Sequence, residues 1–198
     1  PPDAPEPFNA VLRDLETVIL PGLSHWQHPD FFGYFPSNGE LSSVLGDYLS
    51  TGLGVLGLSW QSSPALTELE EVATDWVRQM VGLSAAWSGV IQDTASSSTL
   101  VALLCARERA SGFSLARGGL QSEVAPLVVY VSSHSHSSVE KAALLAGFGR
   151  DNIHVIAADE RHAMRPEALA LAIEADLAAG RVPCAIVATS GTTTTTAF

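Results

Sequence analysis

The chain has 198 residues, of which 46% are hydrophobic and 16% are charged, and its formal net charge is −11. This composition is typical of a globular protein that buries apolar surface, and it argues against a disordered chain. The ten basic residues are scattered singly, so no positive stripe could follow a phosphate backbone, and nucleic acid is not an expected partner.

Membrane and secretion signals are also missing from the sequence. No apolar run approaches the roughly 20 residues that span a bilayer. The first ten residues, PPDAPEPFNA, lack the basic and apolar regions of a signal peptide. The sequence therefore predicts a cytoplasmic protein that does not interact with a membrane.

Three helices are predicted in the first part of the chain. Residues 8–20 carry apolar side chains at helical spacing, and Pro21-Gly22 ends the pattern. Residues 39–54 predict a second helix, and residues 64–82 a third with Pro64 at its first position. The aromatic-rich residues 23–38 follow neither period and predict a structured loop.

From Gly89 onward, short apolar runs alternate with helical segments. A strand over residues 90–92 is predicted to feed a helix that begins near Thr94. The remaining elements are strands at 127–132, 153–158 and 185–189, and helices at 138–148 and 166–179. Near-continuous apolar strands between helices are typical of a parallel sheet covered on both faces. The sequence predicts an α/β chain, with a helical segment over 1–82 and an incomplete α/β domain over 83–198.

Two features that could suggest chemistry have simpler interpretations. Gly52, Gly54 and Gly57 spell the dinucleotide motif G-x-G-x-x-G, but that motif requires a strand before it and a helix after it. A helical pattern precedes these glycines, so we interpret them as a helix end and a turn. Cys105 and Cys184 lie in apolar stretches and are expected to be buried thiols.

Polar residues follow several predicted strands. The stretch TASSST at 94–99 could bind a phosphate with its free backbone N–H groups and hydroxyls, or could be an ordinary helix cap. His134 and His136 follow the strand at 127–132, where α/β proteins bind ligands. A metal pair, a satisfied pair and one ligand-facing imidazole all remain open, and His25 and His28 are the other candidate metal ligands.

Six stretches in consistent order, from about Phe8 to Phe198, resemble the aromatic-L-amino-acid decarboxylases, which use pyridoxal 5′-phosphate (PLP). These stretches are HWQHPDFFGYFPS, LGLSWQSSPALTELEEVATDW, GVIQDTASSSTLVALLCAR, SHSHSSVEKAALLAG, AMRPEALALAIEADLAAGRVP and VATSGTTTTTAF. The resemblance implies a helical interface segment, then the first part of a large PLP-binding domain of the fold type I transferases.

The resemblance also implies roles for individual residues. Thr94, Ala95 and Ser96 match the phosphate-binding turn, His136 matches the catalytic imidazole against the pyridine ring, and Thr193 matches a threonine near the cofactor. His134 has no counterpart with a role, and no metal is implied. Further matches line the substrate side-chain pocket, and two of these, Leu56 and Leu58, reach across a homodimer interface. The pocket residues are Trp26, Tyr34, Phe35, Pro36, Ser37, Leu56 and Leu58.

In the family, the lysine that carries PLP comes later than the position where this chain ends. The sole lysine here, Lys141, is expected on the surface. The resemblance therefore implies decarboxylation of an aromatic L-amino acid that depends on a C-terminal part. The alternatives are a PLP enzyme of the same fold that acts on another amino acid or forms an aldehyde, a non-catalytic fragment that binds a partner chain, and a metal-dependent hydrolase using His134 and His136.

Overall fold

The computed structural model describes residues 3–34, 39–123 and 125–198. Contacts between residues divide the chain into two compact units, residues 1–69 and 70–198, which are described separately below. The boundary between these units falls inside a helix, whereas the sequence suggests a division after residue 82. That division of the chain into domains remains a prediction.

The first unit consists of helices joined by irregular segments. A helical stretch runs through α1 (Phe8–Asp14), a π-helical turn (Leu15–Ile19) and α2 (Leu20–Gly22). After it come α3 (Leu41–Leu53) and the first turns of α4 (Pro64–Met80). All three helices predicted from the sequence are confirmed, with ends that differ by one or two residues.

The end of α3 explains the glycine motif. Gly54 caps the helix in the left-handed conformation, at φ +62°, which glycine adopts without steric cost. The interpretation of Gly52, Gly54 and Gly57 as a helix end and a turn is therefore confirmed.

The first unit buries very little of its apolar surface. Among its described residues, Ser63 alone is buried, and α1, α2 and α3 contain no buried residue. Large exposed apolar side chains in this unit include Phe8, Val18, Tyr48, Leu49, Leu53 and Leu58. Exposed apolar surface on this scale is typical of a segment that another surface covers.

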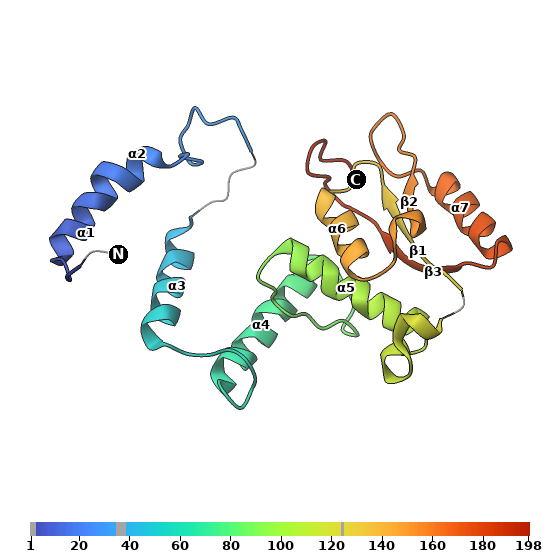
Figure 1. The fold of residues 1–198 in the computed structure, drawn as a ribbon, viewed down its shortest axis with the longest axis horizontal. Coiled ribbons are helices and arrows are strands. Elements are labelled where there is room, and N and C mark those ends of the chain that lie inside the picture. Colours follow the sequence, from blue (N-terminus) through green and yellow to red (C-terminus); the bar gives the residue numbers. More distant parts are fainter. Residues whose placement is uncertain (1–2, 35–38, 124) are drawn as a thin grey trace. The chain divides into compact units, whose positions relative to one another are not determined.

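The second unit contains a three-stranded parallel sheet (Figure 1). Its strands are β1 (Leu127–Ser132), β2 (Ile153–Ile156) and β3 (Val182–Val187), in the order β2-β1-β3. All six residues of β1 are buried because a strand lies on each side of it and helices cover both faces. The predicted parallel α/β sheet is confirmed.

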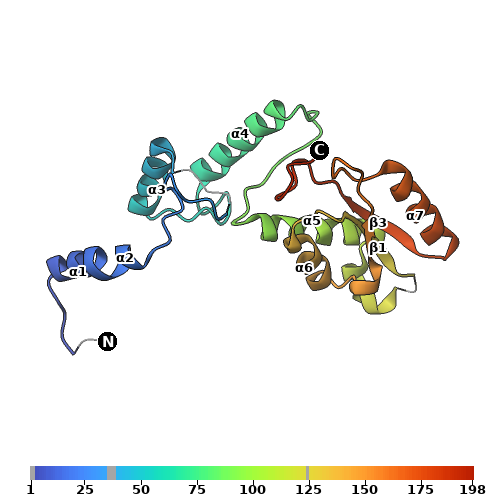
Figure 2. The ribbon, with the colours of Figure 1, turned by 90° about the horizontal axis from the view of Figure 1, so that it is seen from above.

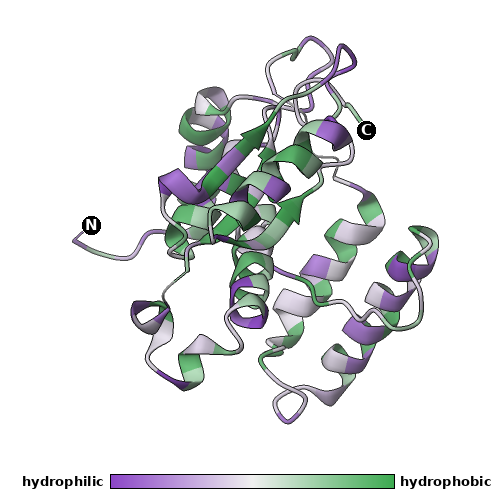
Figure 3. Ribbon diagram, turned by 90° about the vertical axis from the view of Figure 1, so that its right-hand side faces the viewer, coloured by the Kyte–Doolittle hydropathy of each residue, from purple (hydrophilic) through white to green (hydrophobic). Residues whose placement is uncertain are grey.

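Side chains of β1 alternate between two cores. Leu127, Val129 and Val131 pack with α5 (Ala95–Ala110) and α6 (Ser137–Leu145), whereas Val128 and Tyr130 pack with α7 (Pro166–Ala178). Figure 2 shows α5 and α6 on one side of the strands and α7 on the other. Hydropathy colouring shows apolar residues concentrated on the strands and on the helices beside them (Figure 3).

Several sequence predictions need correction. The expected strand at 90–92 is wrong, because these residues are irregular and the side chains of Val90 and Ile91 are exposed. A strand requires a neighbouring strand, and the described part of the chain provides none beside this run. The N–H of Ile91 instead donates to the Glu70 carboxylate (2.6 Å). Cys105 is exposed rather than buried, since it lies on the outer face of α5.

Some element ends also differ from the predictions. The third strand begins at Val182 rather than 185, and it carries a bulge beside Pro183, which has no N–H to donate. Helix α6 ends at Leu145, before Gly147 at φ +86°. None of the described helices is both long and apolar enough to cross a membrane.

A buried polar network links three elements of the second unit. The Tyr130 hydroxyl donates to Asp176 Oδ2 (2.8 Å), and His154 Nδ1 lies 2.9 Å from the same oxygen. Arg181 lies 3.3 Å from Asp176 Oδ1. Burial raises the pKa of Tyr130 above its usual range, so the hydroxyl remains a donor across ordinary pH. Asp176 therefore connects α7 to β1, to β2 and to the residue before β3.

We expect Asp176→Ala to lower the free energy of unfolding by about 3 kcal/mol, because it leaves the buried Tyr130 hydroxyl and the Arg181 guanidinium without their carboxylate. Urea unfolding followed by circular dichroism would measure the change. Asp151→Ala, which removes an exposed carboxylate, is the matched control and should change the stability by less than about 0.5 kcal/mol. Equal effects of the two substitutions would contradict a structural role for the network.

Candidate active site

Several of the predicted functional residues lie at the carboxyl edge of the sheet. His136 follows β1, and Thr193 follows the neighbouring strand β3, so both lie beyond the carboxyl ends of parallel strands. In the last turn of α5, Arg107 donates to the Ala146 carbonyl at the end of α6 (2.7 Å). Both helices pack on one face and meet at their last turns, which places their first turns toward the carboxyl edge.

The first turn of α5 has the features of an anion site. Thr94 caps the helix, and its Oγ1 accepts from the backbone N–H of Ser97 (3.2 Å). Ala95 and Ser96 are exposed at the first two helical positions, where backbone N–H groups have no intrahelical partner. These groups and the positive end of the helix dipole suit a phosphate. The local geometry at Thr94, Ala95 and Ser96 thus suits the phosphate-binding role that the sequence predicts for them, and that role remains a prediction.

An acidic residue lies directly before this turn. A hydrogen bond from the side chain of Ser97 lowers the pKa of Asp93, so its carboxylate is ionised at neutral pH. The carboxylate therefore shares the electropositive helix start with any anion that binds there. Sequence inspection passed over Asp93, although its place beside a candidate phosphate turn was visible.

His136 is held at the start of α6. It caps this helix, and its Nδ1 accepts from the backbone N–H of Ser138 (3.2 Å) and lies 2.9 Å from Ser138 Oγ. The residue is exposed and lines a hollow of about 310 Å³ beside α6 and β2. Within the described residues, Ser135 Oγ in the same hollow is buried without a hydrogen-bond partner. These contacts to α6 orient the imidazole, and no other described residue hydrogen-bonds its Nε2 edge.

The other histidines make different contacts. The ring of His134 meets the ring of His162 edge-on, with centroids 4.8 Å apart. His25 Nε2 lies 3.1 Å from the Leu20 carbonyl, and His28 Nδ1 accepts from the N–H of Asp30. No group of three or more potential metal ligands gathers in the described parts of the chain. The assignment of no metal remains a prediction.

The threonine run forms a turn after β3. Thr192 is buried, its Oγ1 lies 2.6 Å from Thr195 Oγ1, and it accepts from the N–H of Ala197. The hydroxyl of Thr192 is therefore engaged inside the turn, whereas Thr193, like Thr194 and Thr196, is exposed. The role of Thr193 near the cofactor remains a prediction.

The predicted substrate residues belong to the first unit. The indole of Trp26 stacks with Tyr34 (centroids 5.1 Å) and with Phe31 (5.8 Å). Phe31 was not among the predicted pocket residues, although it lies in the same aromatic stretch. Leu56 and Leu58 are exposed. Phe35, Pro36 and Ser37 lie outside the described residues.

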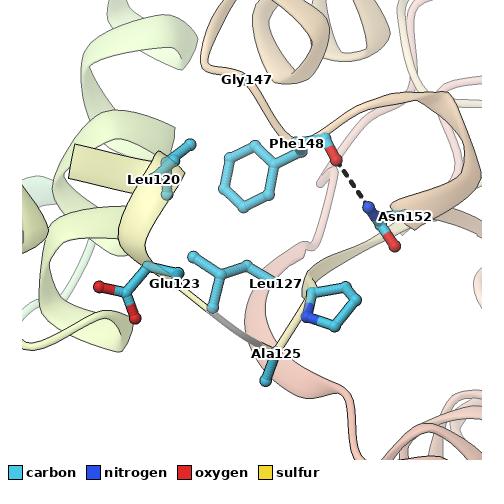
Figure 4. A pocket seen from close by; sticks show the side chains of 8 residues that line it. Leu120, Glu123, Ala125, Leu127, Gly147, Phe148 and Asn152 are labelled. Carbon is cyan, nitrogen blue, oxygen red and sulfur yellow. Dashed lines mark hydrogen bonds between the residues drawn. The ribbon is translucent and has the colours of Figure 1, made fainter. Parts of the chain in front are cut away.

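A smaller cavity of about 190 Å³ lies at the opposite edge of the sheet. Figure 4 shows the ring of Phe148 facing Leu120 and Leu127, the first residue of β1. Asn152 Nδ2 donates to the Phe148 carbonyl (2.8 Å), so this amide is engaged in the local turn. This cavity is separate from the carboxyl edge that carries His136.

Comparison with known proteins identifies the family. The model of the pyridoxal-dependent decarboxylase conserved domain matches residues 1–198. The chain belongs to the pyridoxal-dependent decarboxylase family. It is 43% identical to the aromatic-L-amino-acid decarboxylase of Bos taurus over 100% of its own length and 42% of the relative's. It is 42% identical to the phenylacetaldehyde synthase of Arabidopsis thaliana over 99% of its own length and 41% of the relative's.

Solved structures of decarboxylases share the fold. A crystal structure of Oryza sativa TDC with PLP and tryptamine matches with a TM-score of 0.92 and 36% identity, over 100% of this chain and 42% of that one. Catharanthus roseus tryptophan decarboxylase in complex with L-tryptophan matches with a TM-score of 0.90 and 38% identity, over 100% of this chain and 43% of that one. The chain thus spans well under half the length of these relatives, and it corresponds to their N-terminal part.

The residues present at the carboxyl edge fit PLP, the cofactor of this decarboxylase family. A phosphate ester would find backbone N–H groups without an intrahelical partner at Ala95 and Ser96, and hydroxyls at Thr94 and Ser96. A flat ring would find the exposed imidazole of His136, and Thr193 adds an accessible hydroxyl. Lys141 is exposed, as predicted, and lies within α6.

We expect Asp93→Asn to strengthen PLP binding on the order of threefold, because it removes a negative charge at the helix start that the phosphate would share. Fluorescence titration of the assembled apoprotein with PLP would measure the dissociation constant. Asp151→Asn is the control because it removes the same charge at an exposed position before β2, at the amino edge of the sheet. This substitution should leave PLP binding unchanged. Weaker binding in Asp93→Asn would show that the carboxylate supports the turn instead of competing with phosphate.

Proposed function

We propose that this chain supplies the N-terminal part of a PLP-dependent decarboxylase that converts an aromatic L-amino acid to its amine and CO₂. One observation carries the proposal: the first turn of α5, which suits a phosphate, and the exposed imidazole of His136 both lie at the carboxyl edge of the sheet. PLP, when bound, would take up the electron pair that remains on Cα when the carboxylate leaves.

The residues of this chain would bind and orient the reactants. Thr94, Ala95 and Ser96 would hold the phosphate, and Thr193 would offer a hydroxyl near the ring. His136 would confine the flat ring from one side and remain available for hydrogen bonding through its free ring edge. The chain's own lysine is exposed on α6, so the lysine that binds PLP would come from a C-terminal part of the enzyme.

The aromatic stack of the first unit supports the substrate class. Stacked rings at Trp26 and Tyr34 form a flat apolar wall of the kind that receives an aromatic side chain. Relatives described as tryptophan, tyrosine and aromatic-L-amino-acid decarboxylases support this class without choosing among its members.

We also propose a homodimer in which Leu56 and Leu58 contribute to the partner's substrate pocket. The first unit supports this proposal because its helices leave large apolar side chains exposed, which a partner surface would cover. The cytoplasmic location and the division after residue 82 stay predictions from the sequence. An aldehyde product is the second candidate, since a phenylacetaldehyde synthase is among the relatives of similar identity.

Borohydride reduction of the purified protein with PLP, followed by peptide mass spectrometry, tests the assembly. We expect the pyridoxyl label on a lysine outside residues 1–198, together with release of CO₂ and amine from tryptophan, DOPA, tyrosine or phenylalanine. Specific labelling of Lys141, or no label, would favour a non-catalytic fragment. Aldehyde and ammonia in place of the amine would identify the synthase reaction.

We expect His136→Asn to lower kcat on the order of 100-fold while PLP remains bound, because asparagine can still cap α6 but cannot stack on the cofactor ring or place a donor where Nε2 lies. Stopped assays of CO₂ release and the PLP absorption spectrum provide the two readouts. Lys141→Ala, an exposed change one turn into the same helix, is the control and should retain full kcat. A wild-type kcat in His136→Asn would remove the catalytic assignment.

A further inference from the structure

We propose that Ser138 is a positioning residue that holds the imidazole of His136 with its proton on Nε2. The inference rests on the proposed function of His136 and deepens it by assigning the ring's proton to one atom. Ser138 itself is buried and lies at the second position of α6, two residues after the ring that it orients.

The two contacts to Nδ1 determine the tautomer. A backbone N–H can only donate, so the Ser138 N–H, 3.2 Å away, requires Nδ1 to be an unprotonated acceptor. The hydroxyl of Ser138, at 2.9 Å, can donate to the same lone pair and is the closer of the two groups. In the neutral ring the proton therefore resides on Nε2.

The packing of α6 explains why this orientation is stable. Val139, Ala142 and Ala143 bury one face of the helix in the core shared with β1 and α5. The cap thus fastens the ring to a rigid part of the fold. His136 is exposed, so the two polar contacts at Nδ1 hold its ring more than packing does.

A ring fixed in this way has only one nitrogen for chemistry. Nε2 presents a hydrogen-bond donor to a ligand at the carboxyl edge, because its own proton is the one that the ring retains while Nδ1 accepts from Ser138. A proton on Nδ1 would break the helix cap to the Ser138 N–H, and the Ser138 hydroxyl would have to accept instead of donate. Ser138 therefore places the ring proton on Nε2, the nitrogen that faces the reactants, and it does so without contacting the reactants itself.

The test compares three variants of the complete, PLP-loaded protein: Ser138→Ala, Ser138→Thr and Ser137→Ala. Ser137 is the exposed neighbour at the first position of the helix and serves as the matched control. Ring-15N-labelled histidine, observed by magic-angle-spinning NMR, reports which nitrogen carries the proton, and His136→Asn identifies the His136 signals. Steady-state CO₂ release gives kcat and KM.

We expect a single Nε2–H form of His136 in the wild type, in Ser138→Thr and in Ser137→Ala. In Ser138→Ala we expect an added fraction of the Nδ1–H form, because the shorter hydroxyl contact is lost and only the 3.2 Å backbone contact still favours Nε2–H. The same variant should lose about tenfold in kcat with KM within about twofold, because a misaligned group slows the chemical step more than binding. An Nδ1–H ring in the wild type, or an unchanged tautomer in Ser138→Ala, would overturn the proposal. The NMR readout does not depend on decarboxylation, so it distinguishes failure of this proposal from failure of the proposed activity.

Discussion

Burial of β1 on both faces is the constraint on which the rest of the second unit depends. Its odd-numbered side chains require α5 and α6 on one side, and Val128 and Tyr130 require α7 on the other. Because β1 lies between β2 and β3 in a parallel sheet, the carboxyl ends of all three strands meet at one edge. The same packing sets the direction of α5 and α6, and thereby the place of their first turns.

Helix caps at that edge serve both folding and binding. Thr94 and His136 each satisfy an N–H group at the start of a helix, which stabilises the fold. The first turn of α5 retains unpaired N–H groups for an anion, and the imidazole that caps α6 retains a free nitrogen for chemistry. A capping role also explains how an exposed side chain can hold one orientation before any ligand binds.

The two units differ in how much of their stability can come from within. The second unit has two packed cores and a buried network around Asp176, in which Tyr130 and Arg181 take part. Helices of the first unit bury no residue of their own through α3, although they carry many apolar side chains. Such helices gain most of their stability from packing against another surface, since propensity alone is marginal for short helices.

The sequence by itself determined the elements whose signals are local: the helices with capping residues and stop signals, the strand β1 with its unbroken apolar run, and the helix end at Gly54. The order of motifs also determined the family. Only the tertiary structure decided that residues 90–92 form no strand, that Cys105 faces outward, and that Asp176 joins Tyr130, His154 and Arg181. Each of these depends on which distant segment lies beside a residue, and hydrophobic periodicity does not contain that information.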